Sequence, residues 1–139
     1  MSNPLTWVDL EAAEPARRAR YIDLVYVAGP YSAPTPAERA ANIEAAWTVG
    51  YQVASLGAYP VVPHMNTAHM DDLQDWQWWI DATLELMLRC NAVLMMEGWE
   101  ASRGARGEEA AAKRFEIPVF YKIEDLADWI AEQKRLEGV

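Results

Sequence analysis

Residues 98–115, GWEASRGARGEEAAAKRF, bring together hydroxyl, guanidinium, glycine and carboxylate groups that could bind or transform a ligand. Ser102 is a favourable residue for the start of a helix, and Gly104 lets the backbone approach a ligand closely. The free N–H groups at a helix start attract anions, and Arg103 and Arg106 add positive charge in an acidic protein. The stretch predicts a site for a small anion such as a phosphate, although it lacks the spacing of the common Gly-rich nucleotide loops.

Glu108 and Glu109 in this stretch, together with Asp81 and Tyr26, are the further candidates for chemistry. Acidic residues in the first turn of a helix gain ~0.3–1 kcal/mol from the helix dipole, so both glutamates also fit an ordinary helix start. Asp81 lies in the aromatic-rich segment WQWWIDATLELM, where a solvated acid fits the pattern equally well. Tyr26 lies in the apolar run LVYVA, and composition alone places it in the core.

Metal and thiol chemistry have weaker support in the sequence. His64, His69, Asp71 and Asp72 form the one cluster of metal-ligand types, but two histidines five positions apart are not a helical i, i+4 pair. Histidines in such a loop more often make hydrogen bonds. Cys90 is the only cysteine and precedes an apolar run, which favours a buried, inert thiol. We predict no metal ion and no cofactor.

The elements that must position these residues alternate between strands and helices. Apolar runs of strand-forming residues stand at 24–28, 58–62, 92–96 and 117–121. Segments with helical spacing stand near 43–57, 75–90, 104–115 and 124–136. The alternation predicts an α/β fold with a four- to five-stranded, mostly parallel sheet covered on both faces. Ligands bind such sheets at the carboxyl ends of the strands, where the stretch 98–115 and both histidines are expected.

Length and charge limit the partners of the chain. Its 139 residues, 52% of them hydrophobic, predict one domain over 23–139 and an extension, 1–22, that packs on it. A net charge of −9 argues against binding to a nucleic-acid polymer. No apolar run approaches the ~20 residues that cross a bilayer, and the first residues lack a signal-peptide pattern. We expect a cytoplasmic protein that does not bind membranes.

Several motifs in order resemble the nucleoside 2-deoxyribosyltransferase-like superfamily, and in particular its small branch from phages and bacteria. The resemblance covers roughly residues 24–121 and rests on VYVAGPYS, Asn42, GAYPVVPH, Asp81, CNAVL, the stretch GWEASRGARGEEAAA and IPV. It implies a flavodoxin-like three-layer sandwich and chemistry at an N-glycosidic bond. It also implies a homo-oligomer, for which the cluster of Trp76, Trp78 and Trp79 is a candidate interface.

The resemblance also implies residue roles. Glu108 would attack C1′ of the sugar and form a glycosyl-enzyme, and the dipole of a first-turn position would keep it ionised. Tyr26 would orient Glu108, and Asp81 would hold or protonate the departing base. The expected substrate-binding residues are Gly29, Pro30, Asn42, His64, Ser102, Arg103, Gly104 and Arg106.

Two departures from the transferases favour a nucleotide hydrolase. Six positions before the nucleophile the transferases carry an acid that binds a sugar hydroxyl, whereas Ser102 stands there, as in nucleoside 5′-monophosphate N-glycosidases, where serine helps to bind the phosphate. The transferases also use an asparagine near the C-terminus, and residues 122–139 contain none. We therefore expect hydrolysis of a nucleoside 5′-monophosphate. A deoxyribosyltransferase for free nucleosides and an inactive nucleotide-binding sensor are the alternatives.

Overall fold

Four parallel strands form the centre of the protein. A computed structural model describes residues 22–137, so the predicted extension 1–22 lies outside the described residues except for Ile22. The strands are β1 (Leu24–Ala28), β2 (Tyr59–Val61), β3 (Ala92–Met95) and β4 (Val119–Phe120), in the order β2-β1-β3-β4. All three strand pairs are parallel. The predicted flavodoxin-like α/β fold is thereby confirmed, with four strands in the described residues.

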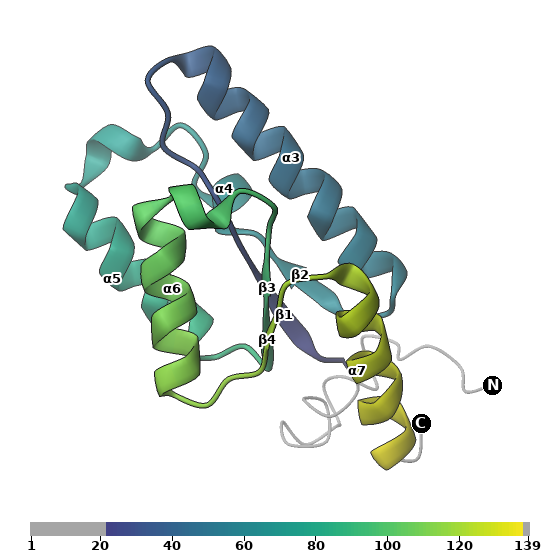
Figure 1. The fold of residues 1–139 in the computed structure, drawn as a ribbon. Helices are drawn as coiled ribbons and strands as arrows, with labels where there is room; N and C mark the ends of the chain where they lie inside the picture. Colours follow the sequence, from purple (N-terminus) through teal and green to yellow (C-terminus); the bar gives the residue numbers. More distant parts are fainter. Residues whose placement is uncertain (1–21, 138–139) are drawn as a thin grey trace, which may run out of the picture.

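Helices cover both faces of this sheet (Figure 1). They are α3 (Pro36–Ser55), the short α4 (Pro63–Asn66), α5 (Trp76–Met87), α6 (Arg103–Arg114) and α7 (Ile123–Leu136), with 3₁₀ turns η1 (Asp71–Leu73) and η2 (Trp99–Ala101). Side chains of Thr35, Asp75 and Ser102 accept hydrogen bonds from the first turns of α3, α5 and α6, which fixes where these helices begin. None of the helices between residues 22 and 137 has the length and apolar character that a bilayer crossing requires.

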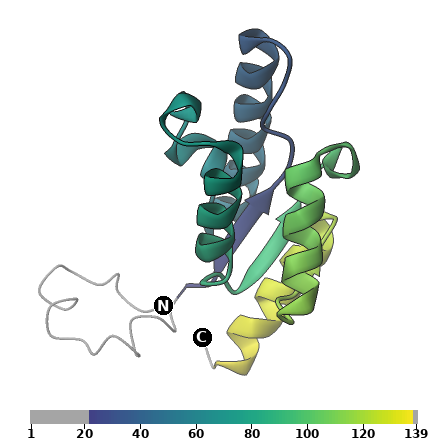
Figure 2. The same ribbon diagram turned by 90° about the vertical axis from the view of Figure 1, so that its left-hand side faces the viewer.

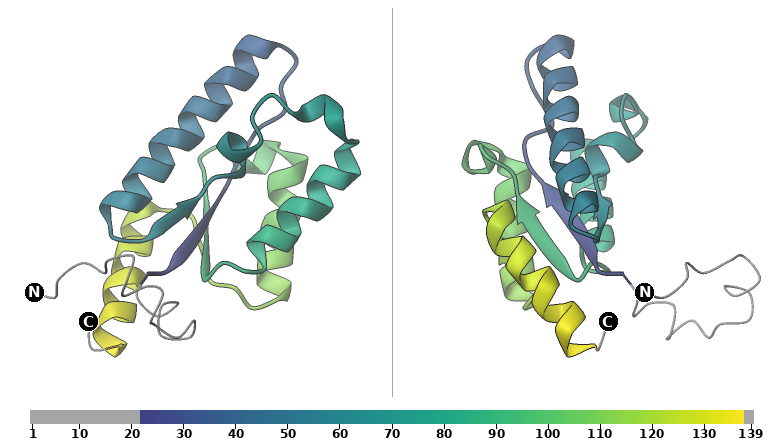
Figure 3. Two further views of the ribbon diagram at one scale, coloured as in Figure 1. Left: turned by 180° about the vertical axis from the view of Figure 1, so that it is seen from behind. Right: turned by 90° about the vertical axis from the view of Figure 1, so that its right-hand side faces the viewer.

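The alternation of side chains along β1 divides the core into two layers. Val25 and Val27 pack with residues of α3 and α7 on one face of the sheet. Tyr26 and Ala28 face the other way and pack with residues of α5 and α6. The side views show the sheet between these two helix layers (Figures 2 and 3). A tyrosine at position 26 is therefore directed toward α5 and α6 by the two-residue period of the strand.

The strand order also creates the crevice in which a ligand can bind. The chain passes from β1 to β2 on one side and then crosses to β3 on the other, so the carboxyl ends of β1 and β3 are adjacent and their connections diverge. The loop after β1 lies close against the end of β3. A Cβ atom at Gly29 would stand 2.6 Å from the sulfur of Met96, so only glycine fits there without a shift.

Candidate active site

A buried tyrosine and a buried glutamate meet at the carboxyl end of the sheet. The hydroxyl of Tyr26 donates a hydrogen bond to Oε2 of Glu108. Tyr26 is on β1, while Glu108 lies on the same buried stripe of α6 as Ala105 and Ala112. The exposed fractions are 1% for Tyr26 and 8% for Glu108. A carboxyl group this deep requires a polar partner, and Tyr26 provides it.

The surroundings of this pair change how both groups ionise. Burial raises the pKa of the Glu108 carboxyl to about 7, against the opposing effect of the Tyr26 hydrogen bond. Burial, followed by the nearby Glu108 charge, raises the pKa of Tyr26 well above its ordinary value. Tyr26 is therefore a hydrogen-bond donor at neutral pH, and Glu108 changes charge close to it.

The predicted placement of Glu108 in a first helical turn is wrong. Helix α6 begins at Arg103 with Ser102 as its cap, and no acidic residue lies in its first turn. Glu108 is the sixth helical residue, beyond the range over which the helix dipole acts strongly. Its carboxyl is governed by burial, which opposes ionisation, instead of by the dipole, which would favour it.

A cavity of about 620 Å³ opens above the pair and collects most of the predicted site residues. Eight of the eleven candidates line it: Tyr26, Gly29, Pro30, His64, Ser102, Arg103, Gly104 and Glu108. Asn42 and Arg106 do not. The Asn42 side chain donates to the carbonyl of Tyr31 at 3.0 Å and so holds the loop after β1. Arg106 donates to the carbonyl of Glu100 at 2.7 Å on the exposed side of α6.

Asp81 does not line the cavity either, and this affects the role expected for it. The cavity-facing residues of α5 follow the helical period and are Trp76, Trp79, Ile80 and Thr83. Asp81 is exposed, and the Gln77 amide donates to its Oδ1 at 2.9 Å. Burial and then the charge of Glu108 raise the pKa of Tyr26, and a hydrogen bond with Thr83, two residues after Asp81, opposes them. Thr83 also lines the cavity. Helix α5 thus offers the cavity a hydroxyl group and no carboxyl group.

One end of the cavity is lined by hydrogen-bond donors at the start of α6. Oγ of Ser102 accepts from the N–H of Ala105 at 3.2 Å, so the hydroxyl still has its own hydrogen to donate. The backbone N–H groups of Arg103 and Gly104 lie in the first turn of α6, where no earlier carbonyl of the helix is available to accept their hydrogen bonds. The guanidinium of Arg103 stacks 4.3 Å from the ring centre of Trp76. This end suits an anion.

Another part of the cavity lining is formed by the loop after β1 and the segment from α4 to η1. The Tyr31 hydroxyl donates to Oδ1 of Asp71 at 2.5 Å, and Arg39 lies 3.5 Å from Oδ2. His64 places Nε2 2.8 Å from the Pro30 carbonyl and 3.2 Å from that of Gly29. Burial lowers the pKa of this imidazole, so His64 is neutral and Nε2 carries its hydrogen.

Several cavity residues were absent from the predicted site. Tyr31 belongs to the motif VYVAGPYS, and Asp71 was considered only as a metal ligand. Trp76 and Trp79 were considered as a candidate subunit interface, and both line the cavity. The helical period through Trp76 and Trp79 includes Thr83 and excludes Asp81, so the sequence itself indicated the inward face of α5. Homo-oligomer formation stays a prediction.

Within residues 22–137, no three His, Cys, Asp or Glu side chains lie close enough together to hold a metal ion.

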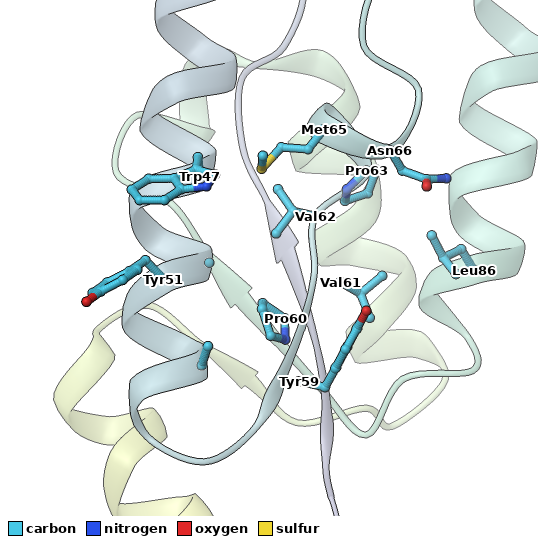
Figure 4. A pocket seen from close by; sticks show the side chains of 12 residues that line it. Trp47, Tyr51, Tyr59, Pro60, Val61, Val62, Pro63, Met65, Asn66 and Leu86 are labelled. Atoms are coloured by element: carbon cyan, nitrogen blue, oxygen red, sulfur yellow. The ribbon is translucent and has the colours of Figure 1, made fainter. Parts of the chain in front are cut away.

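A second cavity, also of about 620 Å³, runs along the β2 edge of the sheet (Figure 4). Trp47 and Tyr51 of α3 stack there with ring centres 5.5 Å apart, facing Tyr59 and Pro60. Its lining includes no carboxyl, imidazole, amino or guanidinium group. Of these two cavities among residues 22–137, only the one above Glu108 combines donors, acceptors and a buried acid.

A family model described as a domain of unknown function, DUF4406, matches residues 23–121, and the chain belongs to that family. The matched segment includes every residue that lines the cavity above Glu108. A search of the curated proteins finds no match.

Proposed function

We propose that this DUF4406 domain hydrolyses the N-glycosidic bond of a nucleoside 5′-monophosphate, with Glu108 as the nucleophile. The observation that carries the proposal is the buried Tyr26–Glu108 hydrogen bond at the floor of a cavity whose rim is a helix start. A carboxylate at the floor and an anion site at the rim suit the two ends of a sugar phosphate, with C1′ toward Glu108 and the 5′-phosphate toward Ser102 and Arg103. The sequence resemblance supports the same roles.

The reaction proceeds in two displacements. The Glu108 carboxylate attacks C1′ as the C1′–N bond breaks, and the base leaves with the bonding electron pair and takes a proton from water. A second water then attacks C1′, the C1′–O bond to Glu108 breaks, and the carboxylate is restored as the sugar phosphate leaves. The proton released by this water neutralises the hydroxide that the first water left when it protonated the base. The sum is one nucleotide and one water converted to free base and sugar phosphate. Tyr26 fixes the attacking oxygen throughout by its hydrogen bond.

The anion end of the cavity favours a nucleotide over a free nucleoside. Ser102 keeps a hydrogen to donate, and Arg103 adds a positive charge at the rim. An acid at position 102 would repel a phosphate, whereas the hydroxyl attracts it. Water is the acceptor we propose for the second step.

A panel of ribo- and deoxyribonucleoside 5′-monophosphates, assayed by chromatography for released base, tests the activity. We expect release from at least one nucleotide, a large loss of that release in Glu108→Gln, and full activity in Glu109→Gln, the matched control one residue away. No release from any nucleotide would overturn the proposed activity. Full activity in Glu108→Gln would overturn the mechanism even if base is released.

Two cap variants separate nucleotides from nucleosides as substrates. Asp and Asn both cap helices well, so Ser102→Asp and Ser102→Asn keep the start of α6 while only the first adds a negative charge. We expect Ser102→Asp to lose nucleotide turnover much more than Ser102→Asn. Equal losses in the two variants would argue against a phosphate at this end. Adding a second free base to the wild-type reaction tests for base exchange, the transferase alternative.

A second candidate function is nucleotide binding without turnover. The observation in its favour is the exposed position of Asp81, which leaves α5 without a carboxyl group to assist the departing base. Micromolar or tighter nucleotide binding by calorimetry, with no base released over hours, would support this reading.

A further inference from the structure

We propose that the cavity wall formed by Tyr31, His64, Thr67 and Asp71, here called the acceptor wall, selects a base that presents two adjacent N–H donors, and that Asp71 is the specificity-determining residue. This inference rests on the proposed nucleotide site. All four residues line the cavity. They lie on the loop after β1 and on the segment from α4 to η1, whereas the donor-rich anion site lies at the start of α6.

The side-chain hydrogens of the acceptor wall are already committed to protein atoms. Tyr31 donates its hydroxyl hydrogen to Oδ1 of Asp71 at 2.5 Å. Thr67 donates its hydroxyl hydrogen to the Pro63 carbonyl at 3.4 Å. The hydrogen on Nε2 of His64 points to the carbonyls of Gly29 and Pro30. No side chain of this wall has a hydrogen left for a ligand.

Acceptor atoms remain on the same wall. Each Asp71 oxygen accepts one hydrogen bond, from Tyr31 or Arg39, and has a further lone pair. Nδ1 of His64 is buried with no hydrogen-bond partner among the described residues, on a side chain only 6% exposed. Because Nδ1 is enclosed by the protein, the lone pairs of Asp71 are the acceptors that a ligand in the cavity can reach. A ligand that brings donors to Asp71 therefore gains more than one that brings acceptors.

The placement of the anion site and the acceptor wall on different elements orients a nucleotide. With its phosphate at the α6 start, the base extends across the cavity toward the acceptor wall and along Trp79 and Ile80, which offer apolar surface for its ring. Asp71 itself is held from three sides, by Tyr31, by Arg39 and by Trp79, whose Nε1 donates to its backbone carbonyl at 3.3 Å. A carboxylate fixed in this way can read the edge of a base.

Hydrogen-bond complementarity then distinguishes the common bases. A carboxylate accepts two parallel N–H groups, and guanine alone carries a ring N–H next to an exocyclic amino group. Adenine and cytosine pair an amino donor with a ring nitrogen that would face the lone pairs of Asp71. Hypoxanthine lacks the amino group, and xanthine has a carbonyl in its place. The acceptor wall therefore favours guanine over these four bases.

Calorimetric binding of GMP, IMP and XMP tests the wall without relying on turnover. We expect wild-type protein to bind GMP about ten-fold more tightly than IMP, because one hydrogen bond to a charged group is lost. Measurements in Glu108→Gln as well as wild type keep the ligand intact should the protein hydrolyse it. Equal affinities for GMP and IMP in both proteins would overturn the inference.

Asp71→Asn tests the residue itself. An asparagine side chain offers one acceptor and one donor, which complements the ring N–H and carbonyl of xanthine, so the preference of GMP over XMP should reverse. Asp72→Asn, in the same 3₁₀ turn but outside the cavity lining, is the matched control and should keep the wild-type preference. An equal loss of GMP and XMP binding in a folded Asp71→Asn protein would mean that Asp71 is only structural.

Two further results separate this inference from its alternatives. Sugar hydroxyls are also hydrogen-bond donors. If binding affinity depends on ribose or 2-deoxyribose and not on the base, the acceptor wall binds the sugar, and the assignment to the base is overturned. Base release that is equally fast from GMP, IMP and XMP would leave the proposed function standing and overturn the specificity. If Asp71→Asn binds XMP more tightly than GMP but no nucleotide is hydrolysed, the result would support base selection by the acceptor wall and contradict the proposed hydrolase activity.

Discussion

Tyr26 on β1 and Glu108 on α6 are joined by a hydrogen bond across the α5–α6 layer of the core, although 82 positions separate them in the chain. Two influences act in opposite directions on the pKa of Glu108. Burial raises the pKa of its carboxyl to about 7, and the hydrogen bond from Tyr26 lowers it from a still higher value. The amount of reactive carboxylate at neutral pH therefore depends on a single hydroxyl group.

This dependence predicts the pH profile of the reaction. The nucleophile must be ionised, so kcat/KM should rise with pH and level off above a midpoint near pH 7. Tyr26→Phe removes the hydrogen bond that favours the carboxylate, so the midpoint should move to higher pH, with activity at pH 7 reduced and partly restored at pH 9.

The shift in Tyr26→Phe is the informative measurement, because the phosphate of the substrate also titrates near pH 6 but is the same for both proteins. A midpoint in Tyr26→Phe that stays in place or moves to lower pH would contradict the proposed role of the tyrosine.

The stability of the fold should also depend on Glu108. Its pKa is raised from 4.5 to about 7 on folding, so its contribution is fully present below about pH 4.5 and is lost as pH rises through 7. Glu108→Gln keeps the shape without the charge. We expect the variant to exceed wild type in free energy of unfolding by on the order of 3 kcal/mol at pH 8, and by little at pH 4.5, in urea titrations.

Glu109→Gln is the control for this measurement. Hydrogen bonds from Tyr121 and then Lys113 lower the pKa of the Glu109 carboxyl, so its charge is favoured in the folded state. Removing that charge should not stabilise the protein at pH 8. A gain in both variants would point to the overall negative charge and not to the burial of Glu108.

The fold could be predicted well because the spacing of apolar residues along strands and helices can be read from the sequence without knowledge of tertiary contacts. The run LVYVA is β1 in full, and the apolar period of the last helix matches Ile123–Leu136 closely. The strands at 58–62 and 117–121 are shorter than predicted, at Tyr59–Val61 and Val119–Phe120. In both runs, apolar residues continue beyond the last residue that pairs with a neighbouring strand. Because a single sequence does not show which strands pair, the ends of the strands could not be predicted from it.

The site was harder to predict, because its residues had to be placed on particular faces. Tyr26 and Glu108 are brought together by a strand and a helix far apart in the chain, and only the resemblance joined them beforehand. Asp81 was expected at the site through the resemblance alone, and the structure places it on the exposed face of α5 beside Gln77. The ionisation of Glu108 was assigned to the helix dipole, although the start of α6 at Arg103 places it under the control of burial.

Position 83 offers a direct test of the α5 assignment. Asp81→Asn should leave kcat/KM within about two-fold of wild type, since exposed substitutions away from a site rarely matter. Thr83→Asp adds a carboxylate beside Tyr26 and Glu108, and the like charge should raise the pKa of Glu108 and move the pH profile upward. A loss of 100-fold or more in Asp81→Asn, with the fold intact by circular dichroism, would instead support the role first expected for Asp81.

The two arginines of α6 should separate in their effects on substrate binding. Arg103 lines the cavity over Trp76, whereas Arg106 donates to the Glu100 carbonyl outside it. Arg103→Ala should raise KM for a nucleoside 5′-monophosphate about ten-fold, the expected loss of one charge-assisted contact with a phosphate, while leaving KM for the free nucleoside little changed. Arg106→Ala should leave both values unchanged. Because the two variants remove the same charge within one turn of helix, equal increases in KM would show that the general positive charge near the start of α6, and not contact with Arg103, attracts the phosphate.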